Sequence, residues 1–149
     1  MRSNKKYLSL KELHFTYEKN FLLFSKLLPN LCGTYNFLYG LPKDEFKLHE
    51  IKITSKKISK FTTDINIYFK DSSLEGNVEI EVRLYQEAKM AEVMKFQGFH
   101  NSLISILPVY KRFGFTKDER FQWNSFLSHF LTHSINSGRS LENHLPARI

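Results

Sequence analysis

Hydrophobic residues recur along the chain with two different periods, and the period near each end is that of a helix. Near the N-terminus, Ser9 and Glu12 have the spacing of a capping box in front of an apolar stripe, and Pro29 follows that stripe. We therefore expect the first helix to begin at Ser9 and to end before Pro29. The residues of the stripe are Leu10, Leu13, Tyr17, Phe21, Phe24 and Leu28.

A second helical pattern lies near the C-terminus. Thr116 and Glu119 have the spacing of another capping box, and Asp118 adds negative charge at the N-terminal end of the helix. Gly138 stands where a helix commonly ends. We expect a helix between Thr116 and Gly138. Its apolar stripe consists of Trp123, Phe126, Leu127, Phe130 and Leu131.

Between these helices, apolar and polar residues alternate with a period of two, which is typical of half-buried strands. The pattern is clearest at 61–69 and 77–85, and weaker patterns cover 33–39 and 46–54, separated by the turn signal "GLPKD". We expect antiparallel strands in these segments. The side chains expected to face the core in the two clear strands are Phe61, Thr63, Ile65, Ile67, Phe69, Val78, Ile80, Val82 and Leu84.

The stretch "VRLYQEAKMAEV" at 82–93 decides how the sheet continues. Its content of Glu, Ala, Lys and Met favours a helix, but the strand alternation before it favours a hairpin with a tight connection at 86–89. We predict the hairpin. Its outer face then carries a cross-strand ion pair, which in itself only fixes the register of the strands. The expected pairs are Leu84 with Ala91, Val82 with Val93, Tyr85 with Met90, and Arg83 with Glu92.

These elements predict a single α+β domain over residues 1–149, with a four- to five-stranded antiparallel sheet packed against an N-terminal and a C-terminal helix. A chain of 149 residues with 42% hydrophobic residues is long enough to bury its own core. The single cysteine, Cys32, excludes an intramolecular disulfide and fits a reducing compartment. The most apolar run, 21–28, is too short for a membrane span. We therefore expect a cytoplasmic protein.

The net charge of +7 raises the question of a nucleic-acid partner. Residues 1–70 carry a net charge of +7, residues 71–98 carry −3 and residues 99–149 carry +3. The densest group of cations lies in "IKITSKKISK" at 51–60, which we interpret as a strand, a turn and a second strand with a basic rim. This rim is either a solvated turn or a phosphate-binding surface. Its lysines, the lysine rim, are Lys52, Lys56, Lys57 and Lys60.

Three blocks of the sequence resemble, in the same order, those of a known family: "YEKNFLLFSKLLP" at 17–29, "VRLYQEAKMAEV" at 82–93, and "KDERFQWNSFL" at 117–127, followed by Gly138. They are similar to the YqiB-like proteins, small proteobacterial cytosolic proteins with a domain of unknown function. The positions that match the family pattern are Glu18, Asn20, Leu27, Leu28, Pro29, Arg83, Leu84, Tyr85, Ala88, Glu92, Val93, Asp118, Glu119, Gln122, Asn124, Phe126 and Leu127.

The chain departs from the family pattern at two positions. Tyr17 stands where Cys is common in similar proteins, and Arg120 stands where Lys is common. The resemblance therefore implies neither a thiol function at Tyr17 nor a lysine-specific function at Arg120 in this chain. The resemblance implies a bacterial cytosolic protein and brings no established activity with it.

Motifs for common catalytic chemistries are missing. The sequence has no phosphate-binding loop, no dinucleotide-binding glycine fingerprint and no nucleophile elbow. His129 and His133 have metal-ligand spacing on a helix, but "HFLTH" lacks the Glu of the metalloprotease motif, and a third ligand such as His100 or His144 would have to join them. We expect a polar stripe there, with no metal or cofactor. The sequence favours a non-enzymatic protein.

Aromatic residues make up 15% of the chain, which argues for interaction with a partner. The segment 96–115 interleaves aromatics with cations and either covers a sheet edge or presents a patch to another protein. We predict a non-enzymatic adaptor or regulatory protein that binds an unidentified cytosolic protein. A homodimer through a sheet edge or this segment is a further option. The predicted binding residues are Arg83, Tyr85, Glu92, Lys111 and Arg112.

Two other functions stay open. The first is a nucleic-acid-binding accessory protein that uses the lysine rim. The second is a small-ligand binder or an unrecognised enzyme with Glu18, Asn20, Asp118 and Glu119 in a cleft. Glu18 and Asn20 interrupt an apolar helix, so we expect one of them to be buried against a partner such as Arg83 or the start of the second helix, in a structural network or a pocket.

Overall fold

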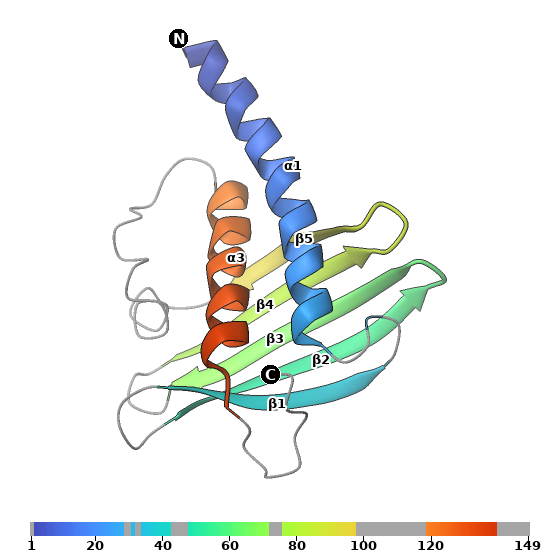
Figure 1. The fold of residues 1–149 in the computed structure, drawn as a ribbon, viewed down its shortest axis with the longest axis vertical. Coiled ribbons are helices and arrows are strands. Elements are labelled where there is room, and N and C mark those ends of the chain that lie inside the picture. The colour runs from blue at the N-terminus through green and yellow to red at the C-terminus, as the bar shows by residue number, and fades with distance from the viewer. Residues whose placement is uncertain are drawn as a thin grey trace.

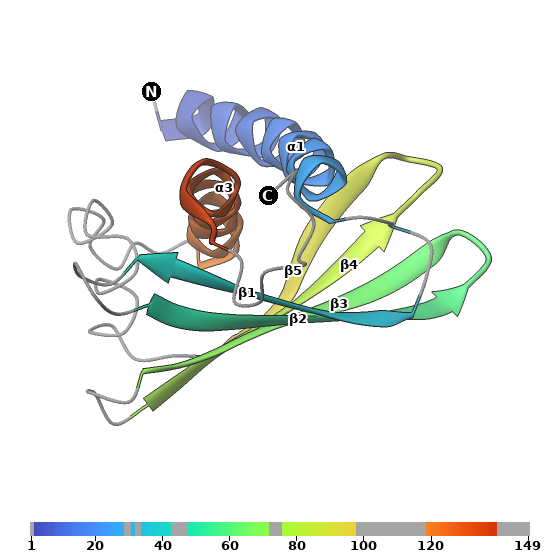
Figure 2. The same cartoon turned by 60° about the horizontal axis from the view of Figure 1, so that its bottom comes forward.

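The computed structural model describes residues 2–28, 31, 34–42, 48–71, 76–97 and 119–139. The elements follow in the order α1 (Arg2–Leu27), β1 (Tyr35–Pro42), β2 (Leu48–Ser59), β3 (Thr62–Asp71), β4 (Gly76–Tyr85), β5 (Met90–Gln97) and α3 (Glu119–Ser137). The five strands form one antiparallel sheet in sequence order. Both helices lie on one side of the sheet (Figures 1 and 2). The expected α+β fold is confirmed.

The core lies between the helices and one face of the sheet because alternate residues of every strand are apolar. Ile51 and Ile53 of β2, Ile65 and Ile67 of β3 and their neighbours in β4 are fully buried. The helices run side by side in the same direction (Figure 1) and contribute several aromatic side chains to this layer. Each large apolar side chain that is fully buried stabilises the fold by about 1.5–3 kcal/mol. The buried aromatics are Phe21, Phe24, Phe37, Tyr39, Phe69, Phe126 and Phe130.

The predicted hairpin of β4 and β5 is confirmed with its register. All four expected pairs are present: Tyr85 with Met90, Leu84 with Ala91, Arg83 with Glu92, and Val82 with Val93. The connection at 86–89 closes with Lys89 in the left-handed region, at a φ of 56°. Beyond Val93 the register shifts, and Glu81 pairs with Lys95, so Met94 is an extra residue in a bulge.

The predicted start of the first helix is wrong. Helix α1 begins at Arg2, so Ser9 lies within the helix and is not its N-cap. No glycine or proline interrupts residues 2–9, and Lys and Leu are good helix formers, so nothing in this segment ends the helix. Helix α3 begins at Glu119, and both Thr116 and Asp118 lie outside the described residues.

Two predicted turns are also placed incorrectly. Strand β1 continues through Pro42. Proline has no backbone N–H to donate, and an edge strand such as β1 tolerates this because it pairs with a neighbour on one side only. Strand β2 runs without a break through Lys56 and Lys57, and the chain turns at Lys60 and Phe61 instead. Phe61, expected to face the core, is therefore 43% exposed. Ser55 is buried and is paired with Ile65 of β3. The alternation of β2 therefore continues to this residue, and the segment belongs to the sheet.

Each edge of the sheet is capped at one point by the chain around α3. At the β1 edge, Gly40 and Arg139 exchange two backbone hydrogen bonds of 2.9 and 2.7 Å. At the β5 edge, the N–H of Val93 donates to Oδ1 of Asn124 at 3.0 Å. Such caps protect strands that would otherwise offer free backbone groups to another strand. Neither described helix combines the length and the apolar character that crossing a membrane requires.

Candidate functional site

The face of the sheet that points away from the helices is an open surface of the described structure. Figure 2 shows the sheet with both helices on the opposite side, and no described helix or strand covers this outer face. Most of its central side chains are half-buried by their neighbours within the sheet. The charged residues on it whose side chains the structure describes are Glu50, Lys52, Lys56, Asp64, Glu79, Glu81, Arg83, Glu92 and Lys95.

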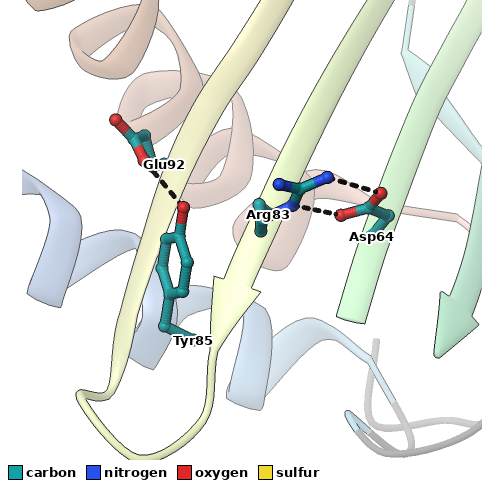
Figure 3. A network of polar contacts seen from close by, with 4 residues as sticks. All are labelled: Asp64, Arg83, Tyr85 and Glu92. Atoms are coloured by element: carbon teal, nitrogen blue, oxygen red, sulfur yellow. Dashed lines mark hydrogen bonds and ion pairs between the residues drawn. The ribbon is translucent and has the colours of Figure 1, made fainter. Parts of the chain in front are cut away.

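Arg83 and Asp64 form a two-pronged ion pair across β4 and β3. Nε of Arg83 donates to Oδ1 of Asp64 at 2.8 Å, and Nη2 donates to Oδ2 at 3.2 Å (Figure 3). The strand register places the two residues directly opposite each other. This planar geometry suits a guanidinium and a carboxylate. The hydrogen bond from Arg83 and the negative charge of Asp64 raise the pKa of the Arg83 guanidinium.

Next to this pair, Glu92 accepts hydrogen bonds from two tyrosines. The hydroxyl of Tyr85 donates to Oε1 at 3.1 Å (Figure 3), and the hydroxyl of Tyr17 on α1 donates to Oε2 at 3.4 Å. Burial is the main cause that raises the pKa of Tyr85, and the bond to Glu92 adds to it. The pKa of Tyr17 is raised by burial and then by the charge of Glu92, while Arg120 acts in the opposite direction.

The cross-strand ion pair predicted between Arg83 and Glu92 is wrong, although the register that it assumed is right. Arg83 has an anion opposite it on each neighbouring strand, and its guanidinium pairs with Asp64. Glu92 lies on the edge strand, where its longer side chain reaches Tyr17 around the edge. The two pairs together form a polar row across β3, β4, β5 and α1. We call Asp64, Arg83, Tyr85, Glu92 and Tyr17 the polar row.

The lysine rim does not form one surface. Lys52 and Lys56 project from the outer face of β2, where Lys56 is opposite Asp64 in the register. Lys57 is the next residue in the strand and so points to the other side. Lys60 lies in the turn, with its Nζ 5.3 Å from the centre of the Phe61 ring. The other predicted cations, Lys111 and Arg112, lie outside the described residues.

The residues proposed for a ligand cleft are likewise not brought together. Glu18 is exposed on α1, where it lines a shallow hollow of about 410 Å³ with Lys11, His14 and Phe15. Asn20 is fully buried on the opposite side of the same helix. Glu119 is the first residue of α3, and Asp118 lies outside the described residues.

Asn20 belongs to a buried network that joins α1, α3 and β5. Its Nδ2 donates to the backbone oxygen of Asn124 at 3.1 Å, and its Oδ1 accepts from Oγ of Ser128 at 2.6 Å. The Asn124 side chain in turn accepts from Val93 N and donates to the backbone oxygen of Arg120 at 2.8 Å. Of the two alternatives for a buried Asn20, a structural network or a pocket, the structure shows the network, whose partners lie within α3 and do not include Arg83. We call Asn20, Asn124, Ser128 and Val93 the buried network.

Asp64 and Tyr17 are the members of the polar row that sequence reasoning missed. The alternation of β3 shows that Asp64 points outward, but the sequence pattern ends one strand at 69 and begins the next at 77, so it does not fix the register between β3 and β4. Tyr17 is 75 residues from Glu92 in the sequence, and no local signal joins them.

Metal chemistry finds no support among the residues that the structure describes. No group of three or more His, Cys, Asp or Glu side chains is placed there to hold a metal ion. His129 is exposed, with Nδ1 2.9 Å from the backbone oxygen of Ser125, and burial lowers the pKa of His133. The two histidines therefore form part of a polar stripe on α3.

Comparisons with known proteins identify the family and leave its activity open. No curated protein matches the chain, and no solved structure matches it. One family model, described as "Protein of unknown function (DUF1249)", matches residues 24–140, which include β1 to β5, α3 and most of the polar row. The chain belongs to this family of proteins of unknown function, DUF1249.

Proposed function

We propose that this protein is a non-enzymatic adaptor or regulatory protein that binds another protein through the outer face of its sheet. The observation that supports this function is the polar row, a set of half-buried and hydrogen-bonded side chains on a face that no described element covers. Arg83, Tyr85 and Glu92 lie at its centre. Arginine and tyrosine are the residue types that most often contribute large binding energies at protein interfaces.

The rigidity of this surface favours binding. A hydrogen bond to Asp64 holds Arg83, and a hydrogen bond to Glu92 holds Tyr85. Strands β3 and β4, which carry Asp64, Arg83 and Tyr85, are each paired with a neighbouring strand on both sides. A partner therefore orders few additional side chains, and the entropic cost of association is reduced. The ion pair is 36% and 38% exposed, so its groups can take new hydrogen bonds without first leaving a buried site.

The charge distribution favours protein over nucleic acid. Among the charged residues named on the outer face there are four cations and five anions, which gives a net charge of −1. Phosphate backbones are bound by surfaces with converging cations and few anions. Alternating signs instead suit a protein surface with a complementary pattern.

Affinity purification of the tagged protein, with and without nuclease, tests the proposal. We expect Arg83→Ala/Tyr85→Ala to lose a protein partner that the wild type retains after nuclease treatment. The matched control is Lys11→Ala/Phe15→Ala, which also removes one cation and one aromatic ring, but from the exposed surface of α1. This control should retain the partner, and both variants should keep the wild-type circular dichroism spectrum.

Two results would count against the proposal. Loss of all partners on nuclease treatment would move the function to nucleic acid and to the lysine rim. Equal loss of the partner in both double variants would place the binding surface elsewhere on the molecule.

We also infer that the protein is a cytoplasmic bacterial protein of the YqiB-like group. The resemblance at 82–93 and 117–127 falls within the matched residues 24–140, and the single cysteine suits a reducing compartment. Fluorescence microscopy of a tagged copy in its source cell, with fractionation as a second measure, tests the compartment.

A further inference from the structure

We propose that the protein bound by the outer face is a second copy of this chain, docked face to face about a two-fold axis that runs along β3. This inference rests on the proposed function, because it assigns the partner of the same surface. The proposed homodimer does not use the sheet edges, which are capped at Gly40 and Val93.

The strand order separates charges of opposite sign on the outer face. Lys52 and Lys56 project from β2 on one side of the central strand, and Glu79 and Glu81 project from β4 on the other side. Tyr68 lies between Lys52 and Glu79 in the register, on β3. The face is therefore positive along β2 from Lys52 to Lys56 and negative along β4 from Glu79 to Glu81, while Glu50 at one end of β2 and Arg83 on β4 carry the opposite sign.

A two-fold axis along β3 matches these charges. Rotation about such an axis places β2 of one copy over β4 of the other, so that Lys52 meets Glu79 of the second copy, and the reciprocal contact follows by symmetry. Glu81 then lies near Lys52 and Lys56 of the second copy. At the next level Lys56 approaches Arg83 of the second copy and the two Asp64 side chains meet on the axis. These are contacts between like charges, but each Asp64 also lies beside the cations of both copies.

Other arrangements fit less well. An axis across the strands at the level of Glu81 would place β2 over β2 and β4 over β4. Lys52 would then meet Lys56, and Glu81 would meet Glu81, while Glu79 would meet Arg83. Like charges brought together at an interface cost binding energy. The axis along β3 is therefore the one of these two that pairs the lysines of β2 with the glutamates of β4.

The area of the face is large enough for such a contact. Five strands at a spacing of about 4.8 Å, with eight to ten residues at about 3.3 Å each, cover roughly 600–800 Å². A standard protein interface buries about 800 Å² on each partner. Tyr68 and Tyr85 add aromatic area to an otherwise polar surface, as in interfaces that form and dissociate.

Charge reversal tests the inference by sedimentation velocity over a range of protein concentrations. We expect the wild type to dimerise, and Lys52→Glu and Glu79→Lys each to raise the dissociation constant at least tenfold. An equimolar mixture of the two variants should dimerise again, because each copy then carries the charges that the other requires. Lys19→Glu, on the exposed surface of α1, is the matched control and should dimerise as the wild type does.

A second measurement reports the position of the axis directly. Asn66 is on the outer face of the central strand, so Asn66→Cys in a Cys32→Ser background should form an intermolecular disulfide under mild oxidation. Lys11→Cys in the same background should not. Asn66→Cys also removes the hydrogen bond of 2.8 Å that Asn66 donates to Glu79, which we expect to lower the stability only slightly on this face.

The possible failures of the two proposals are distinguishable. A wild type that is monomeric at every concentration, or a mixture of variants that does not reassociate, overturns the second copy as partner. A dimer that both charge reversals leave intact overturns the face-to-face arrangement. In each case the affinity purification with Arg83→Ala/Tyr85→Ala still decides whether the outer face binds a different protein.

Discussion

The buried network and the polar row reach the same edge strand, β5, from different sides. The buried network lies under the helices, where Asn20 and Asn124 are fully buried. The polar row lies mainly on the outer face, where Arg83 and Asp64 remain more than a third exposed. Both include a hydrogen bond shorter than 3 Å between two different elements, Ser128 to Asn20 in one and Arg83 to Asp64 in the other. They differ mainly in their access to water.

This difference determines what each network can do. A buried polar group that loses its partner pays the full cost of desolvation, so the buried network is fixed and serves the fold. A half-exposed group that loses its partner is hydrated instead, so the polar row can exchange its bonds for those of another molecule. Similar side-chain chemistry therefore supports packing on one face of the sheet and recognition on the other.

The largest effect on stability should come from the buried network. We expect Asn124→Ala to lower the free energy of unfolding by about 2–3 kcal/mol, because the buried N–H of Val93 loses its acceptor. The matched control is Asn66→Ala on the outer face, which also breaks an asparagine hydrogen bond and should cost less than about 1 kcal/mol. Urea denaturation measures both. Equal losses would contradict the distinction between the two networks.

Tyr39 extends the comparison to pH. It is fully buried, its hydroxyl lies 2.7 Å from Oγ of Ser134, and burial raises its pKa well above the ordinary value. The folded state therefore holds the Tyr39 proton more tightly than the unfolded state does. The contribution of Tyr39 to the free energy of unfolding is therefore fully present below about pH 10, the pKa of tyrosine in the unfolded chain. Above that pH the contribution is lost, by up to about 1.4 kcal/mol per pH unit.

The double variant Tyr39→Phe/Ser134→Ala removes this proton without leaving a buried hydroxyl alone. We expect its stability to fall less steeply than that of the wild type between pH 9 and 11, as followed by urea denaturation at each pH. Identical slopes of stability against pH for the two proteins would show that Tyr39 ionises as readily in the folded protein as in the unfolded one. Tyr85→Phe is the control on the outer face and should change the slope less, because Tyr85 is only half-buried.

The sequence predicted the sheet well where local rules apply. The register of the β4–β5 hairpin followed from alternation and a short connection, because a shift by one residue would have turned Arg83 inward and Leu84 outward. The start of α1 was missed because the spacing of Ser9 and Glu12 was interpreted as a helix start, although no glycine or proline precedes it to end a helix.

The candidate site was predicted only in part, for a physical reason. Arg83, Tyr85 and Glu92 lie within ten residues of one another, so strand geometry places them together. The choice between Asp64 and Glu92 as the partner of Arg83 depends on the β3–β4 register and on side-chain reach, which local patterns do not contain. Tyr17 joins the row through the packing of α1 against β5, a contact that only the folded chain forms.

A smaller effect is expected from the ion pair of the polar row. Arg83→Ala and Asp64→Ala should each lower the free energy of unfolding by less than about 1 kcal/mol, with a coupling energy of about 0.2–1 kcal/mol in a double-mutant cycle. Added salt should reduce the coupling. The matched control is the pair of Lys95 and Glu81, which is 4.0 Å apart and more exposed, and should couple less. A larger coupling in the control pair would contradict the importance of the two-pronged geometry.

The smallest effect concerns the carboxylate that Tyr85 and Tyr17 share. Glu92→Gln keeps the shape of the side chain but removes its charge, so we expect the pKa of both tyrosines to fall toward the ordinary value while burial keeps each above it. Stability at pH 7 should change by only a few tenths of a kcal/mol, because both bonds are half-exposed. Absorbance titration of the single variants Tyr17→Phe and Tyr85→Phe, with and without Glu92→Gln, separates the two hydroxyls. A change confined to Tyr17 would mean that Glu92 belongs to the attachment of α1, and that the recognition surface consists of Arg83, Asp64 and Tyr85 alone.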